Sequence, residues 1–205
     1  TPTGTLHEWA RNLVERLIPP TTEAEREAGI AIAQRELHAL GITGWIDAWV
    51  EPRDEAAYRA VAGRGELTAR VVGSLWWRPG EGLEQVDELI ARRAAGPVGR
   101  FSPSTVKVMV DGVLENGTGA LRESYLDGHG HPTGNSGISF NPPEVLRDAV
   151  VRLDAAGFQV HFHAIGDRAC REALDAVAAA RAANGPTDGR HHIARELDPE
   201  DLARR

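Results

Sequence analysis

The stretch TVKVMVDG (Thr105–Gly112) has the pattern of a buried strand in a parallel sheet. Three valines alternate with Lys107, Met109 and Asp111, and side chains at alternate positions of a strand point to opposite faces of the sheet. We therefore expect the valines to lie beneath covering helices and the other three side chains to face the opposite side. Lys107 is the only lysine in a chain whose other strongly basic side chains are all arginines.

A second stretch, FQVHFHAIG (residues 158–166), repeats this alternation. His161 and His163 share one face with Gln159, and apolar side chains occupy the other face. If the two strands lie in one sheet, a lysine, an aspartate and two histidines converge on one side of it. The sequence therefore predicts a polar site on the face that the helices leave uncovered.

Helical patterns separate the apolar strands along the whole chain. We expect strands at residues 42–50, 67–77, 105–111, 158–166 and 190–194. Strands that alternate with helices form right-handed βαβ units and a parallel sheet. Both a doubly wound sheet and a (β/α)8 barrel fit this order, but no G-x-G-x-x-G follows the first strand, which weakens a dinucleotide-binding fold. We expect an α/β fold with residues 1–205 in one domain.

Three polar residues mark expected helix starts. Thr22 with Glu25 has the spacing of a capping box, and Asn141 and Asp167 stand where an N-cap is expected. Directly before the second of these signals, Asn141, residues 112–140 form a glycine-rich irregular stretch. Loops of this length are uncommon in compact domains and often carry function.

Composition excludes several classes of function. The formal net charge of −7 and the pI of about 5.6 argue against a nucleic-acid-binding surface and a basic membrane-binding face. No apolar run approaches the roughly 18 residues needed to span a bilayer. The first residues lack the pattern of a signal peptide, and the single cysteine, Cys170, excludes an internal disulfide. We expect a cytoplasmic protein.

The polar face has the chemistry of a metal site. Imidazole nitrogen and anionic oxygen are ligands that Zn²⁺ accepts. A protonated lysine cannot bind a metal, but burial favours the neutral amine, which can react with carbon dioxide to give a carbamate. Such a carboxylate on a long stem could bridge two metal ions, and this would explain a lone lysine within a strand.

Structural interpretations stay open beside this one. Lys107 could be a structural lysine that pairs with Asp111 or extends its ammonium group to solvent. His161 and His163 could be hydrogen-bonded core residues. Asp167 fits a helix cap better than a catalytic base.

Three segments together resemble one family. They are VKVMVDGVLENGTGALRESYLDG (106–128), VHFHAIGDRACREALDA (160–176) and RHHIA (190–194). In this order they are similar to the amidohydrolase superfamily, in particular the amidohydrolase-3 branch that contains YtcJ-like proteins and N-substituted formamide deformylase. The resemblance implies a metal-dependent hydrolase on a distorted (β/α)8 barrel that cleaves amide or related carbon–nitrogen bonds. It places this chain at about barrel strands two to six.

The resemblance also implies roles for individual residues. Lys107 would be the carboxylated, metal-bridging lysine, and His163 would be a metal ligand on the next strand. The cofactor would be a divalent metal, zinc in one or two copies. Asp111, Glu115 and Arg168 would lie near a small amide-type substrate. His161 would support the metal ligands without binding the metal itself.

The family pattern is incomplete in these 205 residues. The paired histidines of barrel strand one and the aspartate of strand eight are not in the sequence, and Arg195 stands where a strand-six histidine ligand is expected. We therefore expect a segment of a larger enzyme, or a shortened chain that folds by pairing with another copy as a homo-oligomer. The alternative function is a catalytically incomplete barrel segment that acts as a binding or self-associating module.

Overall fold

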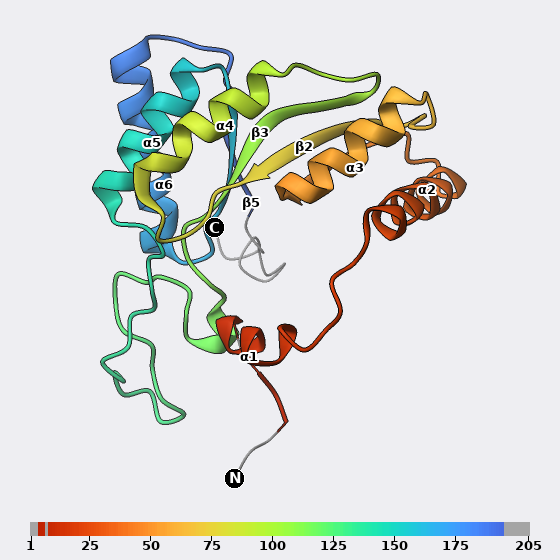
Figure 1. Ribbon diagram of the computed structural model, residues 1–205. Coiled ribbons are helices and arrows are strands. Elements are labelled where there is room, and N and C mark those ends of the chain that lie inside the picture. The colour runs from red at the N-terminus through yellow and green to blue at the C-terminus, as the bar shows by residue number, and fades with distance from the viewer. Residues whose placement is uncertain (1–3, 7, 195–205) are drawn as a thin grey trace.

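A five-stranded parallel sheet forms the centre of the molecule. The computed structural model describes residues 4–6 and 8–194. The strands lie in the order of the sequence, each hydrogen-bonded in parallel to the next (Figure 1). They are β1 (Gly44–Val50), β2 (Arg70–Trp76), β3 (Phe101–Met109), β4 (Gln159–His163) and β5 (His192–Ala194). This order confirms the expected α/β class and matches successive strands of a barrel.

Helices connect the strands and cover one face of the sheet (Figure 1). The longer ones are α2 (Glu23–Ala39), α3 (Pro52–Gly63), α4 (Gln85–Ala94), α5 (Pro143–Ala155) and α6 (Asp167–Asn184). The short ones are η1 (Glu8–Arg11), α1 (Asn12–Glu15), η2 (Gly82–Glu84) and η3 (Leu114–Asn116). Helices α3 to α6 contribute apolar side chains to one hydrophobic core with the strands. None of the helices in the described ranges is long and apolar enough to span a bilayer.

The alternation predicted for β3 and β4 is confirmed. The three valines at positions 106, 108 and 110 are at most 1% exposed and belong to the core under the helices. Val160 and Phe162 of β4 are likewise fully buried there. Because neighbouring side chains of a strand point to opposite faces, Lys107, His161 and His163 lie on the face away from these helices, here called the inner face.

Two of the expected helix caps differ from the structure. The Thr22–Glu25 capping box is present as predicted. Helix α5 instead has Pro142 as its N-cap, and the buried Asn141 accepts the indole N–H of Trp77 and donates to the carbonyl of Met109. The side chain of Asn141 thus joins the ends of β2 and β3, because both offer buried polar groups that need partners. Helix α6 begins at Asp167, with Gly166 as its N-cap.

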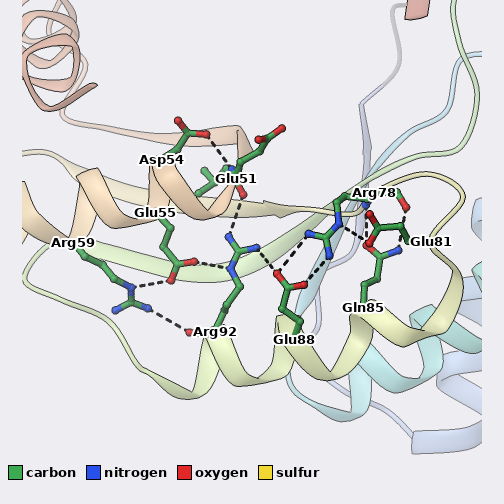
Figure 2. A network of polar contacts seen from close by, with 10 residues as sticks. Glu51, Asp54, Glu55, Arg59, Arg78, Glu81, Gln85, Glu88 and Arg92 are labelled. Carbon is green, nitrogen blue, oxygen red and sulfur yellow. Dashed lines mark hydrogen bonds and ion pairs between the residues drawn. The ribbon is translucent and has the colours of Figure 1, made fainter. Parts of the chain in front are cut away.

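A buried ionic network lies between α3 and α4 and joins the two helices (Figure 2). The carboxylate of Glu55 accepts Nε of Arg59 at 2.8 Å and Nε of Arg92 at 2.7 Å. Arg92 also donates to the carbonyl of Val50 at the end of β1, and Arg59 donates to the carbonyl of Gly96. One carboxylate therefore organises two guanidinium groups and ties two neighbouring helices to the sheet.

Candidate functional site

The register of the sheet arranges the polar side chains of the inner face in rows. Lys107 of β3 is paired with His161 of β4, and His161 is paired with His192 of β5. His163 is paired with Met109, so it lies one row nearer the carboxyl end of the sheet. Residues paired in a parallel ladder point to the same face. The structure therefore makes His161 the direct neighbour of Lys107, with His163 diagonal to it.

Lys107 is buried without a neutralising partner. It is 7% exposed, and among the described residues no carboxylate pairs with its ammonium group. Burial alone lowers the pKa of Lys107 to about 8, because desolvation penalises the charged form. A substantial fraction of the amine is therefore neutral and nucleophilic near pH 8. The alternative of an ion pair with Asp111 is wrong, because backbone N–H groups occupy that carboxylate.

His161 presents an unsatisfied nitrogen beside this amine. It is 9% exposed, its ring centroid lies 4.2 Å from that of His192, and its buried Nδ1 has no hydrogen-bond partner within residues 4–6 and 8–194. Desolvation lowers the pKa of His161 to about 3, and the positive charge of Lys107 contributes further. The imidazole is therefore neutral at physiological pH.

His163 is oriented by a backbone carbonyl. Its Nε2 lies 3.0 Å from the carbonyl oxygen of Gly112. A carbonyl oxygen can only accept, so Nε2 carries the proton and Nδ1 keeps its lone pair. Metal-binding histidines in proteins are commonly held in this way by a hydrogen bond at the second ring nitrogen.

The inner face carries side chains of the kinds that bind metal ions, without a complete set of ligands among the described residues. A catalytic zinc ion takes three protein ligands and leaves one position for water. The ring nitrogens of His161 and His163 and a carbamate at Lys107 have suitable donor chemistry, and the buried Nδ1 of His161 has no hydrogen-bond partner among the described residues. Across residues 4–6 and 8–194, however, no group of three or more His, Cys, Asp or Glu side chains has the geometry to hold a metal. Arg195, at the expected strand-six position, lies outside the described residues.

The three residues expected near the substrate have different surroundings. Asp111 is completely buried and accepts three backbone N–H groups, so its carboxylate is not open to a substrate from solvent. Arg168 donates from one terminal nitrogen to the carbonyls of Ser136 at 3.0 Å and Gly137 at 3.3 Å. Glu115 is exposed on η3. Asp111 and Arg168 thus hold the loop of residues 112–140, while Glu115 is accessible.

Two inner-face features are absent from the sequence-based expectations. Trp76 is paired with Lys107 in the ladder and stacks on Trp49, with ring centroids 3.8 Å apart. His192 completes the row of Lys107, because it is paired with His161 in the ladder. Alternation within LTARVVGSLWW contained the signal for Trp76, but only the pairing of strands shows which residue it adjoins.

Comparison with known proteins identifies the family. The family model described as "Amidohydrolase family" matches residues 1–204. The chain belongs to the amidohydrolase family. Individual relatives are also similar over most of the chain.

Two curated relatives are similar to this chain over most of its length. YtcJ of Bacillus subtilis (strain 168) is 28% identical over 99% of this chain and 37% of its own length. The exoenzymes regulatory protein AepA of Pectobacterium carotovorum is 30% identical over 89% of this chain and 38% of its own length. The chain therefore spans less than two fifths of the length of each.

Solved structures confirm the amidohydrolase fold as part of a barrel. Crystal structures of uncharacterized metal-dependent hydrolases from Pyrococcus horikoshii and Pyrococcus furiosus match with TM-scores of 0.66 and 0.65, each at 26% identity. The matches cover 82% and 84% of this chain, and 33% and 34% of those chains. The five parallel strands correspond to part of the metal-dependent hydrolase barrel.

Replacing Lys107 by methionine should stabilise this amidohydrolase chain at pH 7. The folded wild-type chain holds a desolvated cation with a pKa of about 8, whereas an unfolded lysine titrates at about 10.4. Between these values the unfolded state binds more protons, so wild-type stability rises with pH in that window. The advantage of Lys107→Met should therefore shrink from pH 8 to pH 10.4. Urea unfolding in carbon-dioxide-free buffer measures the difference, and a pH-independent difference would contradict the burial of a titrating amine.

Proposed function

We propose that this chain is part of a metal-dependent hydrolase that cleaves a carbon–nitrogen bond of a small amide or formamide-like substrate. The observation that carries the proposal is the buried amine of Lys107, unpaired among the described residues, on the inner face beside the imidazoles of His161 and His163. Its support includes the family of the chain and its likeness to metal-dependent hydrolases. An isolated buried lysine of this kind has no evident structural task, because it pairs with no carboxylate among the described residues.

Each inner-face residue has a defined part in the proposed site. The neutral Nζ of Lys107 attacks carbon dioxide, an N–C bond forms, and one proton leaves for solvent, so the side chain becomes a carbamate anion. His163 offers the lone pair of Nδ1 because Gly112 holds the proton on Nε2. His161 adds a second neutral nitrogen. These donors would hold a divalent cation, zinc in our proposal, together with ligands from outside the described residues.

A divalent cation at this site would supply two kinds of chemistry: it would make a water molecule more acidic, and it would polarise the carbonyl group of the substrate. The protein's part is to keep the donors neutral or anionic and to exclude bulk water from them. Burial of Lys107 and His161 serves both needs, because each protonated form is disfavoured there. Glu115 is the accessible candidate among the three proposed substrate contacts, since it is exposed on the loop that follows β3.

A binding or self-associating module is the second candidate function. It is favoured by β1 and β5, which lie at the two ends of the sheet and pair on only one side among the described residues. Unpaired strand edges promote pairing with other chains. Sedimentation of a stable dimer that contains no metal and hydrolyses no amide would support this candidate over the enzyme.

Metal content and hydrolysis test the enzyme proposal together. The complete gene product that contains these residues should bind zinc and hydrolyse an N-substituted formamide or N-acyl amino acid. Lys107→Met and His163→Ala should each lower kcat/KM by at least about 100-fold and reduce bound zinc, since even outer residues of metal sites cost 10–100-fold. Added bicarbonate should stimulate the wild type only.

An exposed histidine provides the matched control. His129 lies in the loop away from the strands, so His129→Ala should retain zinc and activity. Full hydrolysis by Lys107→Met, or undiminished wild-type hydrolysis after complete removal of metal, would contradict the proposal.

A further inference from the structure

Asp111 is the point at which the long loop is fastened to the sheet. Oδ1 accepts the backbone N–H of Ile165 at 2.9 Å, and Oδ2 accepts those of Gly166 and Ala120, both at 2.8 Å. The residue is completely buried. Two of its donors belong to the turn between β4 and α6, and the third belongs to the loop. One side chain therefore holds the loop against the end of the strand that carries His163.

Backbone hydrogen bonds from α6 hold the loop at the same point as Asp111. The carbonyl of Ala120 accepts N–H groups of Arg168 and Ala169 in the first turn of α6. A Cβ on Gly166 would lie only 1.9 Å from that carbonyl oxygen, so glycine permits this close approach. The peptide of Ala120 is thus held at its N–H by Asp111 and at its carbonyl by α6.

The residue next to Asp111 orients the candidate metal ligand. Gly112 donates its N–H to the carbonyl of Thr118, and its own carbonyl accepts the proton of His163 Nε2 at 3.0 Å. The N–H of Val110 is likewise bound to the carbonyl of His163. The chain on both sides of Asp111 therefore contacts His163, and the position of the Gly112 carbonyl depends on the fastening of Asp111.

We propose that Asp111 is a positioning residue that fixes the tautomer of His163. By accepting three N–H groups it holds Gly112 so that the carbonyl of this glycine accepts a hydrogen bond from Nε2–H, and Nδ1 is left as the ring nitrogen with a lone pair. The inference deepens the proposed function, because it concerns a residue of the same site. It assigns Asp111 an indirect task and no contact with a reacting atom.

Histidine NMR tests the inference without metal and without activity. In the chain labelled with ¹⁵N-histidine, His163 should show a pyrrole-type Nε2 and a pyridine-type Nδ1, with the signals assigned by their loss in His163→Gln. Asp111→Asn replaces one acceptor oxygen by an amide group. In this variant the ¹⁵N chemical shifts of both His163 ring nitrogens should move toward the averaged values of two exchanging tautomers. Failure of the proposed hydrolysis would leave this measurement unaffected.

Two references make the outcome decisive. His191 is held independently, because its Nδ1 accepts the N–H of Val160 and its Nε2 donates to Asp154, so its unchanged signals report a folded variant. Asp167→Asn is the matched control, since Asp167 accepts the N–H of Arg122 but does not contact Gly112. It should leave the His163 signals unchanged.

The inference fails if wild-type His163 carries its proton on Nδ1. It also fails if folded Asp111→Asn keeps the wild-type His163 signals. If Asp111→Asn loses the His191 signals and is therefore unfolded, Asp111→Glu takes its place. That variant keeps the carboxylate but displaces the loop by one methylene, and the same two outcomes decide.

Discussion

Replacing Gly166 by alanine should lower the free energy of unfolding by about 3 kcal/mol, among the largest effects of any single methyl group in this protein. The added Cβ would stand 1.9 Å from the carbonyl oxygen of Ala120, which is a backbone atom bound to α6 and cannot rotate away. The loop and α6 would have to separate, and the N–H of Gly166 would leave Asp111. The φ angle of Gly166 is −69°, so close approach requires glycine here and backbone conformation does not.

The matched control is another glycine-to-alanine change, one that should increase the free energy of unfolding instead of lowering it. Gly29 lies in the interior of α2, and a Cβ there would meet nothing within 4 Å. Gly29→Ala should raise the free energy of unfolding by about 0.5–1 kcal/mol, because alanine loses less backbone entropy in a helix. Urea unfolding followed by circular dichroism measures both variants. Equal stability of Gly166→Ala and the wild type would show that the loop is not held where the structure places it.

Replacing Glu55 by glutamine should cost about 3 kcal/mol of unfolding free energy, because it removes the charge at the centre of a buried ionic network. The side chain of Glu55 is 8% exposed and those of Arg92 and Arg59 are 12% and 21% exposed. Glutamine keeps the shape but can accept with only one oxygen, and its amide group would face a guanidinium donor (Figure 2). Arg59 would lose its carboxylate partner, and Arg92 would keep only the more distant Glu88, whose Oε1 lies 3.6 Å from its Nη1.

An exposed pair of the same chemistry gives the comparison. Arg171 and Asp175 form an i,i+4 ion pair on α6 with side chains 73% and 59% exposed. Asp175→Asn should change the free energy of unfolding by about 0.5 kcal/mol or less, since solvent screens such pairs. Thermal and urea unfolding of the two variants should therefore differ widely. A similar small effect for both would mean that water reaches the network around Glu55.

The sequence predicted the strands well because their signals are local. The alternation in residues 105–111 and 158–166 records which side chains are covered by helices, and the valines and phenylalanines that it assigns to the helix-covered face are buried in the core. The Thr22–Glu25 capping box is equally local and was found as expected. Asn141 was assigned wrongly as a cap, because its partners, Trp77 and Met109, come from other strands and no local pattern reveals them.

The sequence by itself determined the parallel α/β order, the face on which Lys107, His161 and His163 lie, and the family motifs. These features depend on the two-residue period of a strand and on short motifs, both of which are written along the chain. Only the tertiary structure decided that Lys107 adjoins His161, that Asp111 binds three backbone N–H groups, and that Gly112 holds His163. The strands that pair here, and most of the buried polar groups that contact one another, come from segments about 50 residues apart. No local pattern records such contacts, so they are determined by how the segments pack.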